Sequence, residues 1–278
     1  MKSRAVAGCG LLAVACLSGA AVAGPLCGAP VLALDGGVQR SHWEEFNAQG
    51  RSLLREDGTL QVLGLSLGSD CSGVRWSARV GHAQGTRSYQ GVTTLDAPIQ
   101  TASRIEQTLG QIEALSPVGR NCSLGGRLGY RRIARDIAGV GDVLGYPERF
   151  ADWQAAAGLR CTVAQSPALM LTLETWLGAG PQGTLLLRLP QADPATLRIG
   201  GSRLVQLGAQ VGGRLATPGL AARQDAWTWQ ARLDYVAERF AAGASQAIFR
   251  NGVLVGAAAQ PATRQSALRL EGALQYHF

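Results

Sequence analysis

The C-terminal stretch from Arg264 to Phe278 alternates strictly between two kinds of side chain. Counted back from the end in steps of two, Phe278, Tyr276 and Leu274 begin a run in which every residue is apolar or glycine. The intervening positions, which include His277, are mostly polar or charged. A period of two is characteristic of a β-strand with one apolar face and one polar face. We therefore predict that the chain ends in an amphipathic strand.

The same alternation recurs along the chain and predicts an all-β domain of about ten strands. The predicted segments are 31–43, 52–68, 73–83, 101–115, 122–135, 149–161, 168–177, 202–215, 226–240 and 264–278. One face of most segments is apolar and the other is polar. This combination fits the wall of an antiparallel transmembrane β-barrel, which is apolar toward lipid and polar toward the lumen. Asp57-Gly58 interrupts the second segment and suggests a bulge or a hairpin turn there.

The predicted connections alternate between short and long. The short ones are 69–72, 116–121, 163–167 and 217–225, and the longer ones are 84–100, 136–148, 178–201 and 241–263. This arrangement is typical of a barrel with both termini in the periplasm. Aromatic residues gather near the predicted strand ends, where an amphipathic ring meets lipid headgroups. They are Trp43, Trp76, Trp153, Trp227, Trp229 and Tyr276.

The last strand resembles that of bacterial outer-membrane β-barrel proteins. Their final strand typically ends in Phe, with an aromatic residue two positions earlier, as Phe278 and Tyr276 do here. The resemblance implies that these two residues carry the signal read by the barrel assembly machinery. It also implies location in the outer membrane of a Gram-negative bacterium. The expected partners are periplasmic chaperones, outer-membrane lipid and lipopolysaccharide.

The N-terminus has the features of a secretory signal peptide. A basic start and an apolar core precede Ala21-Val22-Ala23, which is the small-x-small pattern of a signal peptidase site. We expect residues 1–23 to be removed and residues 24–278 to form the barrel. The alternative is a lipoprotein that is cleaved before Cys16.

The composition argues against a helical membrane protein and against a nucleic-acid-binding protein. Hydrophobic residues make up 46% of the 278 residues, yet beyond the N-terminus no apolar run is long enough for a spanning helix. The net charge of +7 comes without a Lys/Arg cluster interleaved with aromatic residues, so we expect no nucleic-acid partner.

The cysteines predict two disulfides. Two of the six lie in the predicted signal peptide, and the remaining four form no C-x-x-C unit of a zinc site. Cys122 begins the fifth predicted strand and Cys161 ends the sixth, so antiparallel pairing brings them together. Cys27 and Cys71 fall at the same end of the barrel and would form the second bridge. Four free thiols are the alternative.

Several charged residues fall on the inward parity of the predicted strands. They are Arg75, Arg79, Arg127, Arg131, Glu174, Arg232, Asp234, Arg269 and Glu271. About ten strands enclose little space, so charges inside must pair or be hydrated. We predict a structural ion-pair network. The alternative is a narrow, anion-preferring pore.

Two glycine motifs match catalytic or phosphate-binding patterns by chance. Gly64–Gly68 reads G-x-S-x-G, but it lies within an alternating strand and not at a strand-to-helix turn. Gly178–Gly183 reads G-x-G-x-x-G, but Pro181 and the apolar residues that follow predict a loop and no helix. We therefore expect no cofactor and no metal.

In size and predicted strand number the chain resembles the omptins, ten-stranded outer-membrane proteases. The resemblance covers architecture only. Their sites use one Asp pair and one Asp-His pair at the outer rim, and this sequence contains neither Asp-x-Asp nor Asp-x-His. His42 and His82 fall near the outer strand ends and on the lipid-facing parity, and Ser41 beside His42 does not amount to a catalytic pair.

We interpret the chain as an integral, porin-like outer-membrane barrel without enzymatic activity. Its role would be structural, adhesive or the passage of small solutes through a narrow lumen. The alternative is an outer-membrane hydrolase with its site at the extracellular rim. A soluble periplasmic sandwich is disfavoured, because apolar faces rich in aromatic residues recur around the chain.

Overall fold

The computed structural model describes residues 27–92, 97–166, 168–215 and 226–278, and its regular elements are all strands. Ten of them form the barrel. These are β1 (Val31–Phe46), β2 (Ser52–Cys71), β3 (Val74–Val92), β4 (Pro98–Pro117), β5 (Cys122–Ile137), β6 (Tyr146–Gln165), β7 (Met170–Gly180), β10 (Ser202–Arg214), β11 (Trp227–Phe240) and β14 (Ala262–His277). The predicted signal peptide, the alternative lipoprotein cysteine and the connection 217–225 lie outside the described residues.

The barrel is antiparallel and closed. Its strands follow chain order from β1 to β7 and then β10, β11 and β14, and β14 pairs back onto β1 from Val31↔His277 to Phe46↔Ala262. Closure leaves no barrel strand with an unpaired edge, which is the condition for crossing lipid. Each of the ten predicted segments corresponds to one barrel strand, so the predicted fold class is confirmed.

Two local predictions were wrong. Most of the predicted loop 84–100 is strand, because β3 runs on to Val92 and β4 begins at Pro98. No bulge or turn occurs at Asp57-Gly58, and both residues pair with β1 and with β3. A side chain at Gly58 would lie 2.3 Å from the Thr86 carbonyl oxygen, so this glycine permits close approach of β3.

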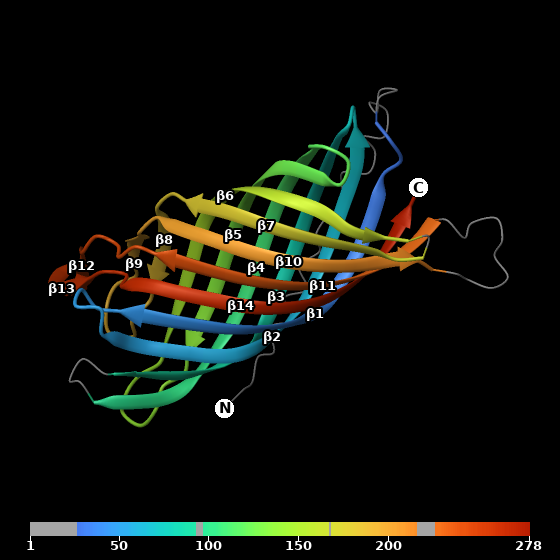
Figure 1. Ribbon diagram of the computed structural model, residues 1–278. Helices are drawn as coiled ribbons and strands as arrows, with labels where there is room; N and C mark the ends of the chain where they lie inside the picture. The colour runs from blue at the N-terminus through green and yellow to red at the C-terminus, as the bar shows by residue number, and fades with distance from the viewer. Residues whose placement is uncertain (1–26, 93–96, 167, 216–225) are drawn as a thin grey trace.

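Two long connections contain hairpins. The first is β8 (Gly183–Leu187) with β9 (Ala195–Ile199), and β8 pairs with the start of β6. The second is β12 (Gln246–Arg250) with β13 (Val253–Ala258). In Figure 1 all four strands gather at the left end, opposite the C-terminus. We call this end, comprising the hairpins and the barrel-strand ends around them, the head.

An apolar belt surrounds the outer wall between the head and the chain termini. Its outward side chains include Leu34, Leu63, Val80, Ile112, Leu177 and Leu270, all of them exposed. Trp76, Trp227 and Tyr276 border it on the terminal side, and Tyr130, Trp153 and Tyr235 on the head side. Aromatic borders of this kind match the two interfaces of a bilayer. In the described part of the chain, no helix is long and apolar enough to span a membrane.

Trp43 does not belong to these borders, contrary to the prediction. Its side chain points into the head, is 3% exposed and donates a hydrogen bond from Nε1 to Glu45 Oε1 at 2.9 Å. The inward parity of Trp43 along β1 is the physical reason, since odd-numbered residues of this strand face the interior.

Two disulfides lie at the end opposite the head. Cys27 is bonded to Cys71, and Cys122 to Cys161, which is the predicted pairing. Cys122 and Cys161 lie directly opposite each other on β5 and β6. Both bonds therefore tie strand ends that are 44 and 39 residues apart in sequence.

Peptide mapping under non-reducing conditions should recover Cys27–Cys71 and Cys122–Cys161 peptides. Replacing both cysteines of either pair with serine should lower the free energy of unfolding by about 2–4 kcal/mol, because the loop in the unfolded chain is no longer closed. Denaturant unfolding of the folded barrel measures this loss. A Cys71–Cys122 peptide, or unchanged stability in both double variants, would contradict the assigned strand ends.

Candidate functional site

The barrel encloses a cavity of about 990 Å³ that opens at the disulfide end. Its mouth is formed by end connections, including Gly119, Asn121 and Ser166, and its walls by inward side chains of the strands. Amides are frequent on these walls. They belong to Gln39, Gln107, Gln111, Gln154, Gln206, Gln210, Gln230 and Gln275.

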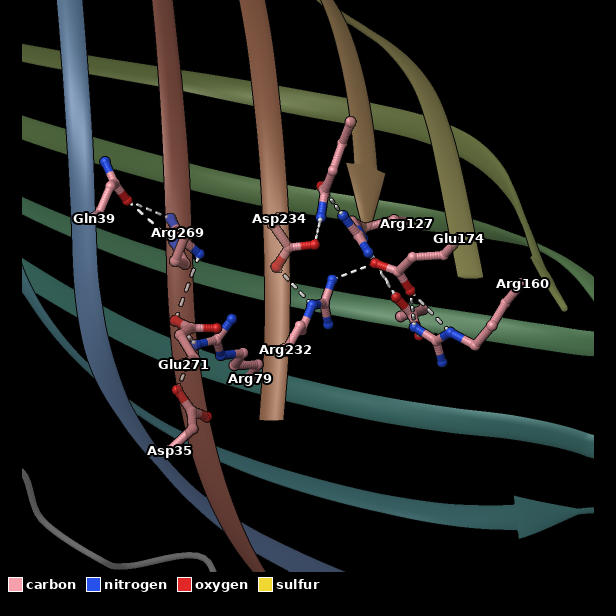
Figure 2. Close-up of polar contacts among 12 residues, drawn as sticks. Asp35, Gln39, Arg79, Arg127, Arg160, Glu174, Arg232, Asp234, Arg269 and Glu271 are labelled. Atoms are coloured by element: carbon pink, nitrogen blue, oxygen red, sulfur yellow. Dashed lines mark hydrogen bonds and ion pairs between the residues drawn. The ribbon is translucent and has the colours of Figure 1, made fainter. Parts of the chain in front are cut away.

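A closed ring of ion pairs and amide contacts crosses this lumen (Figure 2). Its order is Arg232, Glu174, Arg160, Glu113, Arg127, Gln206, Asp234 and back to Arg232. The N···O distances are 2.9 Å from Arg160 to Glu174 and 3.0 Å from Arg127 to Glu113. The ring joins side chains from six barrel strands and so braces one half of the wall against itself.

A second group of contacts braces the other half. Arg79 on β3 bonds Asp35 on β1 at 2.5 Å and Glu271 on β14 at 2.8 Å. Arg269 donates from Nη2 to the side-chain oxygen Gln39 Oε1 at 2.8 Å. Space for the ring is made by Gly208, where a side chain would lie 2.6 Å from Asp234 Oδ1 and 2.8 Å from Glu174 Cγ.

The two groups together carry no net charge when ionised. Their five cations are Arg79, Arg127, Arg160, Arg232 and Arg269. Their five anions are Asp35, Glu113, Glu174, Asp234 and Glu271. A balanced set of charges offers no excess of positive charge to select anions, so the arrangement supports a structural network.

Eight of the nine predicted lumen charges lie inside the barrel. Arg75 does not: its side chain is 62% exposed at the disulfide end and pairs with Asp70 at 3.2 Å. β3 begins at Val74, so Arg75 lies at the rim although its parity is inward. Sequence reasoning missed several partners that share the inward parity and could have been found by it. They are Asp35, Glu113, Asp152, Arg160 and Glu238.

Arg131 forms the next layer toward the head. Its guanidinium is buried and pairs with Asp152 at 2.9 Å and with Glu238 at 2.8 Å. Gln154 and Gln265 also donate to these carboxylates. Arg131 is part of the cavity lining, which also reaches Ser41 and Arg87.

A hydrophobic core fills the barrel beyond Arg131. It brings together Trp43, Leu60, Ile105, Phe150, Leu185, Leu197 and Phe240 with further buried residues. Trp43 packs against Phe150 with ring centroids 5.4 Å apart, and the β8–β9 hairpin supplies Leu185 and Leu197. The void lined by Trp43, Phe150 and Phe240 has a volume of about 10 Å³, too small to hold a continuous file of water.

A second charged cluster is buried within this core. Arg135 donates from Nε to Glu148 at 2.6 Å and from Nη2 to Glu45 at 3.0 Å, and it lies 3.7 Å from Glu56. Arg87 contacts Glu56 at 3.5 Å. The cluster thus has three carboxylates for two guanidiniums.

The excess of carboxylates favours one bound proton. Glu148 lies on the head side of the belt, where burial raises its pKa from 4.5 to about 7, despite the opposing effect of Arg135. Nearby Glu45 raises it further by charge repulsion.

The outer wall of the head carries a histidine–carboxylate pair. His42 Nδ1 lies 2.8 Å from Asp57 Oδ1, and His42 Nε2 lies 3.8 Å from Glu44. Burial alone would raise the pKa of Asp57, but hydrogen bonds from His42 and Arg55 lower it overall. Asp57 is therefore ionised at neutral pH and can orient the imidazole.

Ser41 is not part of this pair, because it faces inward and accepts a hydrogen bond from Arg87 Nε at 2.9 Å. On the outer wall, Ser266 on β14 lies directly opposite His42. Only the register between β1 and β14 brings Ser266 and His42 together, so no local pattern along the chain indicates this pair. His82 is separate and contacts Thr108 Oγ1 at 3.4 Å.

Neither glycine motif precedes a helix, as a catalytic or phosphate-binding motif of its type would. Gly64–Gly68 lies within β2, which pairs on both sides, and Gly178–Gly183 joins β7 to β8 without a helix. Across the described residues, no group of three or more His, Cys, Asp or Glu side chains is arranged to hold a metal ion. Tyr276 packs between Trp227 and Phe278, with ring centroids 4.9 and 5.0 Å away, at the disulfide end of the outer wall.

No protein-family model and no curated protein matches the sequence. Among solved structures, the outer membrane protease OmpT from Escherichia coli is similar over 91% of this chain and 97% of its own, with 11% identity and a TM-score of 0.52. The translocator domain of the autotransporter NalP from Neisseria meningitidis is similar over 90% of this chain and 89% of its own, with 13% identity and a TM-score of 0.44. The β domain of the Bordetella autotransporter BrkA is similar over 91% of this chain and 100% of its own, with 15% identity and a TM-score of 0.41.

The likeness to OmpT shows the fold. The chain is a closed ten-stranded antiparallel β-barrel of the outer-membrane type. At 11% identity the likeness carries no activity from OmpT to this chain.

Stability should fall as pH rises from about 4.5 to about 7, because the unfolded chain releases the Glu148 proton in this window while the folded barrel retains it. The free energy of unfolding should fall by at most about 3 kcal/mol, and the fall should be complete above pH 7. Unfolding of wild type and Glu148→Gln across this window measures it. The variant should show a flatter profile, and Glu106→Gln, outward on β4, should keep the wild-type slope. A wild-type profile that rises through this window would contradict the assignment.

Proposed function

We propose that this protein spans the outer membrane as a structural barrel that is closed to ions and solutes and presents its head outside the cell. The belt with its aromatic borders supports the spanning position. The hydrophobic core supports closure, because it fills the barrel between the cavity and the head. This core is the observation that carries the proposal.

Passage of small solutes is less well supported. A route from the cavity to the head would have to pass Arg131, held by two carboxylates, and then the packed rings of Trp43, Phe150 and Phe240. Opening it would expose buried charge and apolar surface together, and both cost free energy.

The disulfides and the connections support an orientation. An oxidising compartment is where Cys27–Cys71 and Cys122–Cys161 would form, and the periplasm is such a compartment. The long connections with their hairpins lie at the opposite end, as extracellular loops do in this class. Export by a signal peptide and assembly through Tyr276 and Phe278 belong to the same proposal.

The tip of the head favours a contact role. Val253, Leu254 and Val255 on β13 are all more than half exposed, and in the described part of the chain β12 and β13 form a sheet of only two strands. Exposed apolar residues on a hairpin suit attachment to another surface better than they suit catalysis.

Wild-type barrel inserted in planar bilayers should show no stepwise conductance, since the core seals the lumen. Phe150→Ala combined with Phe240→Ala should produce measurable steps by opening a gap beside Trp43. The matched control is Leu63→Ala with Trp76→Ala on the outer wall, which should stay silent. Gel mobility before and after boiling identifies folded variants. Stepwise conductance of the folded wild type would overturn the proposal.

A second candidate function rests on the His42–Asp57 pair. An imidazole oriented by an ionised carboxylate can act as a general base, and Ser266 lies directly opposite on β14. Because these groups face outward beside the belt, their substrate would be an ester of a membrane amphiphile.

Ester hydrolysis by the folded barrel in mixed micelles decides between the two candidates. Under the hydrolase alternative, His42→Ala and Ser266→Ala should each reduce the rate at least about a hundredfold, as removal of a base or nucleophile does. His82→Ala, an outward histidine away from the pair, should keep the rate. Equal rates in all three variants, or no activity, would exclude this alternative.

A further inference from the structure

Three arginines form one row across the outer wall at the head side of the belt. Arg203 on β10 is opposite Arg239 on β11, and Arg239 is opposite Arg264 on β14. All three side chains are exposed and share the outward parity of the belt residues. Neighbouring strands lie about 5 Å apart, so the three guanidiniums can act together on one ligand. We call these residues the arginine row.

Among the described residues the row forms no ion pair, although Glu44 on β1 lies directly opposite Arg264. Like charges directly opposite each other destabilise a sheet. Beyond its two ends lie Ala179 on β7 and Glu44 on β1, and Glu44 is 3.8 Å from His42. Within the ranges that the structure describes, no ion pair joins the arginine row to a carboxylate. Glu44 faces only the Arg264 end of the row, so the repulsion between Arg203 and Arg239 is not relieved by an ion pair within the described residues.

Several other outward arginines of the barrel are paired, among them Arg55 with Asp57. Arg104 lies 3.0 Å from Glu106, and Arg149 lies 2.7 Å from Asp136. The guanidiniums of the arginine row thus differ from those of Arg104 and Arg149 in one respect: within the described residues, no carboxylate forms an ion pair with them.

One member of the row is held in place. The Arg264 guanidinium lies 4.7 Å from the centroid of the Phe46 ring, a cation–π contact that leaves its N–H edge free to bind. A guanidinium held in this way loses less freedom when it binds an anion.

The wall beside the row is apolar. On the same three strands, toward the belt, lie Val205, Tyr235 and Leu268, which are 44%, 47% and 48% exposed. A ligand that covers both surfaces must have an anionic end and an apolar end. Its anionic end would lie at the headgroup level and its apolar end in the bilayer core.

We propose that the arginine row binds the phosphate groups of an anionic membrane lipid in the leaflet next to the head. Guanidinium and phosphate pair by parallel N–H···O bonds, and phosphates on one headgroup can span adjacent arginines. The inference rests on the proposed position in the membrane. It identifies by residue the contact with lipopolysaccharide, the phosphorylated lipid expected from the sequence.

The test uses folded barrel in an uncharged detergent, with lipid A, the same lipid without phosphates, and inorganic phosphate as probes. Native mass spectrometry measures bound lipid. Wild type should bind lipid A at least about tenfold more tightly than the phosphate-free lipid, and Arg203→Gln/Arg239→Gln/Arg264→Gln should remove that difference. The control is Arg75→Gln/Arg104→Gln/Arg149→Gln, which removes the same charge from paired arginines and should bind as wild type does.

Three results would overturn the proposal. They are wild-type affinity in the arginine-row variant, equal weakening in the control, and displacement of lipid A by an equal concentration of inorganic phosphate. Gel mobility confirms that each variant is folded. Conductance of the same samples is a separate readout, so failure of the closed-barrel proposal would be seen independently of lipid binding.

Discussion

The ring of guanidiniums and carboxylates across the lumen is the interaction on which the barrel depends. A ten-stranded wall turns its polar faces inward into a narrow space, where an unpaired charge would be costly. The structure meets this constraint by pairing every arginine of the ring with at least one carboxylate from another strand, as Arg160 does between Glu113 and Glu174. Charge balance inside the barrel is the consequence.

The same strands serve two environments along their length. Within the belt, their inner faces are charged and their outer faces are apolar. At the head this is reversed: Ile105 and Phe150 face inward into a packed core, while Arg104 and Arg149 face outward. The reversal puts a packed core at one end of the barrel and a polar cavity at the other. It also places the arginine row and the His42–Asp57 pair where the apolar belt ends.

Alternation along each strand was enough to predict the barrel, the strand count and the disulfide pairing, because a period of two and the antiparallel order fix which ends meet. In the fourth predicted segment, Ile105 and Leu109 lie on the parity opposite to Ile112, so alternation alone does not say which face is apolar. The structure explains this: Ile112 faces lipid and Ile105 faces the head core. The outer wall could not be predicted, because Ser266 opposite His42 and Arg239 beside Arg264 depend on register between strands distant in sequence.

Access to the lumen from each side tests the central claim of a barrel sealed at the head. Gln111 lines the cavity on β4, and the four described cysteines are bonded to one another, so Gln111→Cys introduces a single reactive thiol into the mature barrel. A maleimide that cannot cross membranes would be added to either face of oriented proteoliposomes. The account predicts labelling from the disulfide side and none from the head side. Equal labelling from both sides would contradict it.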